Sequence, residues 1–418
     1  MTTTAADADI LVIGTGAAGL SAAIALADAG FTVAAVGSLE QFGNGRTVAL
    51  FEASLRFYDA LNIWPRLTKS AAGIETIRMV DATQARLPIP PIEFRAEEIG
   101  LSAFGENVEN DALVRCLADV AAEKQSLSIA NERLVDLIDD DNAIEAVFQS
   151  GHRIRAKLIV AADGQRSTVR AKAKIGARRW SYPQTAMTAL TAHEMPHNGL
   201  SVEFHTRSGP CTLVPLSASA DAPNRSSLVW LMRPEDAARR HKLSQEDFAG
   251  ELERQVGAIF GPMRLDGALG SFPMTGLRVS RLTARRIALL GEAAHVFPPL
   301  AAQGLNLSLR DTAALVECVS RAKQSGEDIG APSVLAAYAD ARRADISLRT
   351  HGIDILNRSL LADFVPVDLV RGASFVAFNM IGPLRRAIMR EGILPRGHLP
   401  PLMQRPRAIH KAERKRLG

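Results

Sequence analysis

Residues 10–19 read Ile-Leu-Val-Ile-Gly-Thr-Gly-Ala-Ala-Gly, an uncharged apolar run that leads directly into a glycine-rich turn. The apolar run predicts a short buried strand, and the alanine-rich residues 17–29 predict a helix after the turn. Residues 32–36 predict a second buried strand, so this part of the chain is a strand–helix–strand unit. Similar buried runs at residues 158–162 and 287–290 predict that one sheet is assembled from distant pieces of the chain.

The three glycines of the turn have different physical tasks. Gly14 makes the tight turn, and Gly16 lets the backbone approach a pyrophosphate. Gly19 lets helix and strand pack closely, so that the helix N-terminus, with Ala17 and Ala18, faces the phosphates. A merely structural glycine turn is the alternative. The strand–turn–helix context favours a dinucleotide-binding site at these five positions.

The end of the second strand departs from this pattern. Nucleotide-binding units of this kind usually place there an acid that hydrogen-bonds the ribose hydroxyls, but this chain has Gly37. Glu40 either reaches the ribose instead or is an exposed loop acid. The unit alone therefore does not decide which dinucleotide is bound.

Two further motifs follow much later in the chain. Residues 160–170 read Val-Ala-Ala-Asp-Gly-Gln-Arg-Ser-Thr-Val-Arg, and residues 290–306 read Leu-Gly-Glu-Ala-Ala-His-Val-Phe-Pro-Pro-Leu-Ala-Ala-Gln-Gly-Leu-Asn. In this order after the glycine-rich turn, they resemble the motifs of class A flavin monooxygenases, which have the p-hydroxybenzoate hydroxylase fold. From residue 8 to about 395 the chain resembles the ubiquinone-biosynthesis hydroxylases, with further matching segments at residues 45–50, 104–110, 338–343 and 354–358.

This resemblance implies an FAD-dependent aromatic-ring hydroxylase that uses O2 and takes electrons from NADPH or NADH. The implied substrate is a polyprenylated phenol of ubiquinone biosynthesis. Besides the residues of the turn, the positions that match the family's motifs are implied to hold FAD; they are Arg46, Asn110, Asp163, Gly291, Glu292, Gly304, Leu305 and Asn306.

The residues themselves agree with a flavin site at the third motif. A reduced flavin carries negative charge, and a helix N-terminus is a favourable partner for it. Residues 303–306 stand at the start of a predicted helix, where Gly304 removes a side chain that would block the ring. Pro298 and Pro299 stiffen the preceding loop, although such a pair often only punctuates structure.

Two positions of the third motif depart from the family pattern, as Gly37 does. Glu292 stands where an aspartate is usual, so its carboxylate is one methylene further out and still within reach of the ribitol chain. Ser308 replaces a glycine inside the helix, where we expect it to be harmless. In the second motif, Arg166 and Arg170 either supply positive charge to the site or are solvated helix residues.

No catalytic acid or base can be named from the sequence. His193, His197, His205 and His295 are candidates by residue type only, and a lone histidine is more often structural. The three cysteines are widely scattered, with no CxxC pair and no Cys/His cluster, so we expect a reducing cytoplasm and no metal site.

The fold class that follows is α/β, with a Rossmann-like FAD-binding domain, an inserted antiparallel substrate sheet and a C-terminal helical lobe. We expect the FAD-binding domain at residues 1–79, 96–179 and 276–345, and the substrate domain at residues 80–95 and 180–275, where alternating stretches and turn prolines suggest an antiparallel sheet. The remaining residues, 346–418, form the helical region and a basic tail.

The positive charge of the chain is concentrated at its end. From Arg396 onward there are seven Lys or Arg and one Glu, a charge of +6, so the rest of the chain sums to 4 − 6 = −2. Such a tail either lies against anionic lipid or a partner protein, or is a frayed end. Residues 360–394 form either an apolar face with a cationic rim for a membrane surface or an amphipathic helix on the protein's own core.

We therefore expect a cytoplasmic protein that either stays in solution or lies peripherally at the inner membrane face, with other ubiquinone-biosynthesis proteins as partners and without nucleic acid. Two other functions stay open. One is a soluble class A hydroxylase of a small aromatic acid, and the other is a non-catalytic flavin-binding scaffold subunit.

Overall fold

The first sheet is centred on β1 (Ala8–Ile13), the strand that leads into the glycine-rich turn. The computed structural model describes residues 7–38, 45–83, 90–140, 142–298, 302–361, 382–393 and 398–404. Within them the main path of this sheet runs, in order, β18 (Thr283–Ala284), β19 (Ile287–Leu289), β11 (Arg153–Ala161), β1, β2 (Val33–Val36) and β8 (Leu127–Ala130). Strands β10 (Ile144–Phe148) and β9 (Leu134–Asp139) extend it as a hairpin beside β11.

The predicted strand–helix–strand unit is confirmed, with α1 (Ala17–Asp28) between β1 and β2. The two distant runs are confirmed as well, since they are the end of β11 and β19, both parallel to β1 in the same sheet. Val12 pairs with Ala35 on one side and with Val160 on the other. Because these strands are parallel, their carboxyl ends meet at one edge of the sheet, where ligands bind in such folds.

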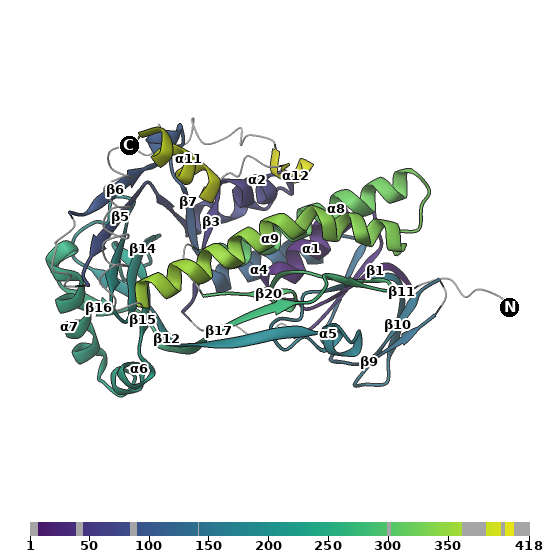
Figure 1. The fold of residues 1–418 in the computed structure, drawn as a ribbon, viewed down its shortest axis with the longest axis horizontal. Coiled ribbons are helices and arrows are strands. Elements are labelled where there is room, and N and C mark those ends of the chain that lie inside the picture. The colour runs from purple at the N-terminus through teal and green to yellow at the C-terminus, as the bar shows by residue number, and fades with distance from the viewer. Residues whose placement is uncertain are drawn as a thin grey trace.

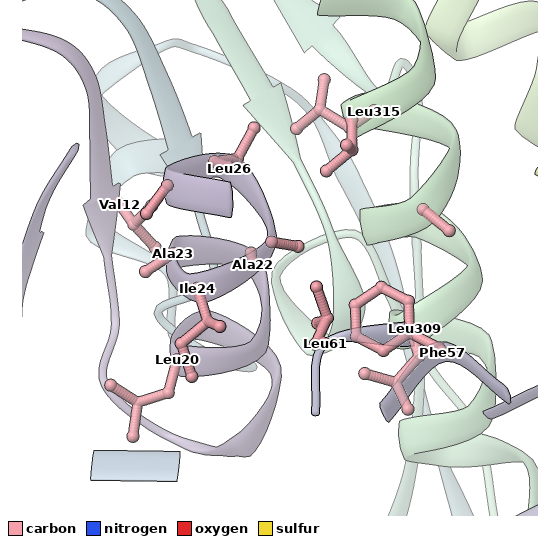
Figure 2. Packing of buried hydrophobic residues seen from close by; sticks show 14 of the residues in the cluster. Val12, Leu20, Ala22, Ala23, Ile24, Leu26, Phe57, Leu61, Leu309 and Leu315 are labelled. Atoms are coloured by element: carbon pink, nitrogen blue, oxygen red, sulfur yellow. The ribbon is translucent and has the colours of Figure 1, made fainter. Parts of the chain in front are cut away.

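Small side chains let α1 pack tightly into the core behind the turn. Ala22 and Ala23 are completely buried, as are the larger Leu20 and Ile24. Figure 2 shows these side chains between Val12 of β1 and the helix α8 (Gln303–Gln324), which contributes Leu309 and Leu315. The core thus fixes the start of α1 against both the sheet and α8.

The second sheet occupies the other end of the molecule (Figure 1). Its described strands are, in order, β20 (His295–Val296), β17 (Gly270–Val279), β12 (Ala177–His193), β15 (Arg225–Met232), β14 (Gly209–Leu216), β13 (Leu200–Thr206), β5 (Thr76–Asp81) and β6 (Ile92–Arg95), with β16 (Met263–Leu265) beside β12. Helices α6 (Pro234–Arg240) and α7 (Gln245–Val256) pack beside it.

One strand pair of this sheet differs from the antiparallel expectation. β5 runs parallel to β13, with Phe204 opposite Val80. A parallel pair needs a long connection, and β5 comes from a segment far earlier in the chain than β13. This early segment contributes β5 and β6 to the sheet, beginning at Thr76.

A small third sheet joins the two larger ones, with β3 (Thr47–Phe51) and β4 (Ala71–Ile74) on either side of β7 (Gly105–Glu109). Around it lie α2 (Glu52–Ala60), α3 (Trp64–Leu67) and α4 (Asn110–Ala122), while α5 (Thr168–Lys172) follows β11. The long α9 (Pro332–Leu361) packs on α8 and reaches from β18 of the first sheet to β14 of the second (Figure 1).

In the described part of the chain after α9, two short helices are present. α11 (Gly382–Ile393) packs on the protein's own core, because Met389 and Ile393 are buried with Phe51 and Phe104. α12 (Pro401–Gln404) packs against α2 and α8 through the fully buried Met403. Most of the segment proposed for a membrane surface, residues 362–381, lies outside the described residues, as does the tail from residue 405. None of the described helices is long and apolar enough to cross a membrane.

Candidate functional site

A cleft of about 1040 Å³ opens at the carboxyl ends of the parallel strands. Ile13 and Val36, the last residues of β1 and β2, line it, as do Ala162 after β11 and Leu290 after β19. This is the edge at which open parallel sheets bind nucleotides.

Three helices begin at this cleft. Ala17 of α1, Asn110 of α4 and Gly304 of α8 all line it. The residue that precedes each of these helices, Gly16, Glu109 or Ala302, makes no side-chain capping hydrogen bond. Their N–H groups and helix dipoles therefore direct partial positive charge into one space, which suits a pyrophosphate and a negatively charged ring.

The three glycines of the turn differ in what surrounds them. A Cβ on Gly14, whose φ is +116°, would lie 2.3 Å from the carbonyl oxygen of Ala162, and one on Gly19 would lie 1.9 Å from that of Gly14. A Cβ on Gly16 would meet nothing within 4 Å. Gly14 and Gly19 are thus required by the protein's own packing, whereas Gly16 leaves open space in the wall of the cleft.

Asp163 lines the cleft with one carboxylate oxygen unused. Its Oδ2 accepts a hydrogen bond from the Val169 amide at 3.1 Å, but its buried Oδ1 has no hydrogen-bond partner within the described residues. Burial raises the pKa of this carboxyl, although the hydrogen bonds it accepts oppose the shift. A buried acceptor without a donor is what a bound hydroxyl or amide of a ligand would satisfy.

Arg170 neither lines the cleft nor lies in solvent, so both expectations for this residue were wrong. Its Nη1 donates to the Ala293 carbonyl at 2.7 Å and its Nη2 donates to that of Gln165 at 2.6 Å. With its side chain buried, it ties the loop after β11 to the turn after β19. Arg166 is exposed at the surface.

Glu292 and Arg46 both line the cleft, although they come from distant parts of the chain. Glu292 is exposed to the cleft, whose walls raise the pKa of its carboxyl by partial desolvation, while the positive charges of Arg46 and His295 oppose the shift. The Arg46 guanidinium lies 5.0 Å from the centre of the Phe272 ring. Both charged groups therefore remain available to a ligand in the cleft.

A buried ionic network holds the turn that carries Glu292. The carboxylate of Asp311, completely buried in α8, accepts hydrogen bonds from the Gly291 amide at 3.0 Å and from Nε of Arg342 in α9 at 2.8 Å. Nε2 of His295 lies 2.7 Å from the same carboxylate. Burial would raise the pKa of Asp311, but the charges of His295 and Arg342 outweigh it and lower the pKa.

The network continues to the start of α8. Arg342 pairs with Asp345 at 2.9 Å, which in turn pairs with Arg349 at 2.8 Å. Arg349 donates to the Gln303 side chain at 2.6 Å, so the first residue of α8 is fixed from α9. Sequence reasoning missed this network; its signal was the pair Arg310-Asp311 inside an apolar helical pattern.

Two residues of the third motif do not act as expected. The side-chain amide of Asn306 forms all of its hydrogen bonds within the protein. Its Oδ1 accepts hydrogen bonds from the Phe51 amide and the Ser54 hydroxyl. Its Nδ2 donates hydrogen bonds to the carbonyls of Ala49 and Ala302. It joins α8 to β3 and does not line the cleft. Ser308 does line the cleft, and its hydroxyl would lie 2.8 Å from a Cβ on Gly291. It therefore shapes the site instead of being an indifferent helix residue.

The expected cofactor-binding positions fall into two groups, those that line the cleft and those that lie behind its wall. Gly14, Gly16, Ala17, Ala18, Arg46, Asn110, Asp163, Glu292, Gly304 and Leu305 line the cleft, whereas Gly19, Gly291 and Asn306 lie behind its wall. Glu40 and Pro299 lie outside the described residues.

None of the four candidate histidines is among the residues that line the cleft. His295 is buried on Asp311, and His205 pairs with Glu203 at 2.5 Å in the second sheet. His193 contacts the Met195 carbonyl and the Ser226 hydroxyl, and burial lowers its pKa. His197, whose pKa burial also lowers, contacts the Leu216 carbonyl. The described geometry assigns no catalytic base.

Sequence reasoning missed much of the wall beyond the ends of β2 and β8. These residues carry no motif and lie on loops from separate segments; they are Ser38, Asn131, Glu132, Arg133, Gln149 and Ser150. The pairing of β2 with β8 brings Ser38 and residues 131–133 to the turn. The pairing of β10 with β9 places Gln149 and Ser150 beside residues 131–133.

The residues present fit a flavin dinucleotide. The cleft has the volume of a large cofactor, a glycine turn with open space at Gly16, three uncapped helix N-termini and an unused acceptor on Asp163. Within the described ranges no group of three or more His, Cys, Asp or Glu is arranged to hold a metal ion.

Comparisons with known proteins agree with this geometry. A family model described as "FAD binding domain" matches residues 7–347. Ubiquinone hydroxylase UbiL of Rhodospirillum rubrum is 35% identical over 407 residues, covering 95% of this chain and 92% of that protein. The 3-demethoxyubiquinol 3-hydroxylase of Escherichia coli is 29% identical over 395 residues, covering 91% and 97%.

Solved structures share the fold at lower identity. The p-nitrophenol 4-monooxygenase of Pseudomonas putida superimposes with a TM-score of 0.76 at 17% identity, over 93% of this chain and 99% of that one. HpxO of Klebsiella pneumoniae, solved with FAD and uric acid, gives a TM-score of 0.72 at 18% identity, over 92% and 96%.

Proposed function

The chain belongs to the FAD-binding-domain family of class A flavin monooxygenases, and on that premise we propose that it hydroxylates the ring of a polyprenylated phenol in ubiquinone biosynthesis. NADPH or NADH is the proposed reductant, and O2 is the source of the oxygen atom. The observation that carries the proposal is the cleft itself, in which the three motifs meet on a chain 35% identical to a named ubiquinone hydroxylase over 95% of its length.

FAD, when bound, supplies the chemistry of electron acceptance and oxygen activation. In the proposed site, the amides at Gly16, Ala17 and Ala18 hold the pyrophosphate, because the start of α1 offers unpaired donors there. The start of α8 at Gly304 and Leu305 places positive dipole charge against the ring. Arg46 and Glu292 complete the polar wall.

Asn110 and Asp163 are proposed to bind polar atoms along the middle of the cofactor, since both line the cleft. Gly14 and Gly19 shape the turn, and Gly291 and Asn306 position their neighbours from behind the wall. Apolar residues around Ala302, among them Phe51 and Val214, pack behind the first turn of α8, so that a ring bound at Gly304 would be shielded from water on that side. Exclusion of water strengthens the electrostatic contacts made there.

For the domains we propose residues 1–79, 96–179 and 276–345 as the FAD-binding part, residues 80–95 and 180–275 as the substrate part, and residues 346–418 as the C-terminal region. Strands β5, β12 and β17 each cross one of these boundaries. The two parts therefore share continuous strands in place of flexible linkers. This favours a substrate site held rigidly against the cofactor.

The proposed location is the cytoplasm, peripheral at the inner membrane face, with other proteins of ubiquinone biosynthesis as partners. A prenylated substrate is largely hydrocarbon and resides in the bilayer, and a basic tail is suited to anionic lipid. The charge of +6 from Arg396 onward supports this location.

The test begins with the purified protein, which should be yellow and release FAD, not FMN, on denaturation. Tightly bound NAD without flavin would exclude the proposal. NAD(P)H oxidation that a prenylated phenol stimulates, with hydroxylated product, would distinguish an enzyme from a scaffold subunit. Restoring ubiquinone in a deficient strain, with loss of one accumulated intermediate, would distinguish it from a hydroxylase of small aromatic acids.

A further inference from the structure

The end of β2 has no room for the acid that usually binds the ribose. A Cβ on Gly37 would lie 2.7 Å from the Thr15 hydroxyl and 2.9 Å from the Thr15 amide nitrogen. Thr15 also donates a hydrogen bond to the Ser38 carbonyl at 3.0 Å, so its side chain is held in this place. The glycine-rich turn itself therefore excludes any larger residue at position 37.

The neighbouring strand supplies a carboxylate at the same edge. Val36 pairs with Ala130 of β8, and the Gly37 amide donates to the Ala130 carbonyl at 3.1 Å. Glu132 follows Ala130 by two residues and lines the cleft together with Gly37 and Ser38. Adjacent strands lie about 4.8 Å apart, a distance that a glutamate side chain spans.

Glu132 is half-buried, and no hydrogen bond or ion pair to its carboxylate is present among the described residues. The exposed Arg133 beside it also lines the cleft, through which a ligand can reach both. The geometry supplies an acceptor next to the place where the ribose of a dinucleotide lies once its pyrophosphate is at the turn.

We propose that Glu132 accepts hydrogen bonds from the ribose hydroxyls of the adenosine half of FAD, in place of the acid that the end of β2 cannot carry. The inference rests on the proposed function, because it presumes that FAD occupies the cleft. Glu132 is a binding residue in this assignment and takes no part in the chemistry of the ring.

The test uses apo-protein from which the flavin has been removed, with FAD binding followed by flavin fluorescence. Glu132→Ala should weaken FAD binding on the order of tenfold to a hundredfold, the contribution of a hydrogen bond to a charged acceptor. Glu132→Gln keeps the size but not the charge, and should fall between parent and Glu132→Ala. Asp139→Ala, which removes a carboxylate of β9 that does not line the cleft, should bind FAD like the parent.

A second measurement identifies the partner atoms. ADP should displace FAD from the parent at lower concentration than 2′-deoxy-ADP or 3′-deoxy-ADP does, because the deoxy compounds lack a hydroxyl. In Glu132→Ala this preference should disappear. If Glu132→Ala kept the parent's preference for ADP over the deoxy compounds, the assignment would be wrong. It would also be wrong if Glu40→Ala lost that preference while Glu132→Ala retained it. Neither result would affect the proposed function. A parent protein that does not bind FAD would instead refute the proposed function.

Discussion

Two opposing effects act on the pKa of the Glu292 carboxyl. The surrounding protein raises its pKa by removing water, while Arg46 and His295 favour the charged form. Because Glu292 is exposed to the cleft, a ligand bound there can donate a hydrogen bond to this carboxylate.

We therefore expect Glu292→Ala to weaken FAD binding by about 1.5 to 3 kcal/mol, or about tenfold to a hundredfold. Glu292→Asp should lose much less, because it restores the acceptor at the length that the family commonly uses. Titration of FAD into apo-protein, followed by flavin fluorescence, measures both. Equal affinities for the parent and Glu292→Ala would remove this residue from the site.

At the same scale, Ser308 and Asn306 show what a motif does not reveal. The sequence places both residues at the start of a helix. Only the folded structure shows that the Asn306 side chain contacts β3 and that Ser308 lines the cleft. Arg170 is a similar case, since its bonds go to carbonyls 5 and 123 residues away.

At the scale of elements, different glycines of the turn between β1 and α1 serve the protein's own packing and the binding of the cofactor. Gly16→Ala should leave the free energy of unfolding nearly unchanged, because a Cβ there meets nothing, but should weaken FAD binding by narrowing the approach of the pyrophosphate. Gly14→Ala should destabilise the protein itself, because its φ of +116° and its contact with Ala162 both exclude a Cβ. Thermal melts and FAD titrations of the two variants would show this division. Equal losses of stability in both would contradict it.

The network between α8 and α9 supports a second prediction at this scale. Asp311→Asn breaks a buried ion pair and leaves Arg342 short of a partner, at a cost of about 3 to 5 kcal/mol in the free energy of unfolding at pH 7. Since the pKa of Asp311 is lowered in the fold, this stabilisation is present above its ordinary value of 3.8 and is lost as the pH falls through the folded value. The difference between variant and parent should therefore shrink toward acid pH.

Denaturant unfolding from pH 7 downward measures that difference. The matched control is Asp340→Asn, which removes an exposed pair with Arg343 on the same helix, α9, and should change stability by less than about 1 kcal/mol. A pH-independent loss in Asp311→Asn would show that packing, and not charge, is what the substitution disrupts.

Elements could be predicted where their pattern is local. The strand–helix–strand unit follows from apolar runs and glycines within one short stretch, and it was predicted correctly. The parallel pairing of β5 with β13 and the place of Glu132 beside Gly37 depend on which strands become neighbours. No local propensity encodes those neighbours, so neither could be predicted from the sequence.

For the whole molecule, the distribution of charge leads to a prediction about membranes. Residues 405–418 contain six Lys or Arg and one Glu, a charge of 6 − 1 = +5. Deleting them should weaken binding to anionic vesicles, with a salt dependence in the parent, and leave FAD content intact. The deletion begins at residue 405 because Met403 of α12 belongs to the core. Vesicle co-sedimentation measures the effect, and unchanged binding would show that the tail does not contact lipid.

The assembly of the first sheet from distant strands affects how the protein is made. β1 ends at Ile13, but β19, which completes the parallel strands on the far side of β11, begins at Ile287, 287 − 13 = 274 residues later. At roughly 5 to 20 residues per second, a ribosome takes roughly 14 to 55 s to deliver that interval. β11 ends at Ala161, so for the last 287 − 161 = 126 residues of this interval its apolar edge lacks β19 and is exposed to other nascent proteins.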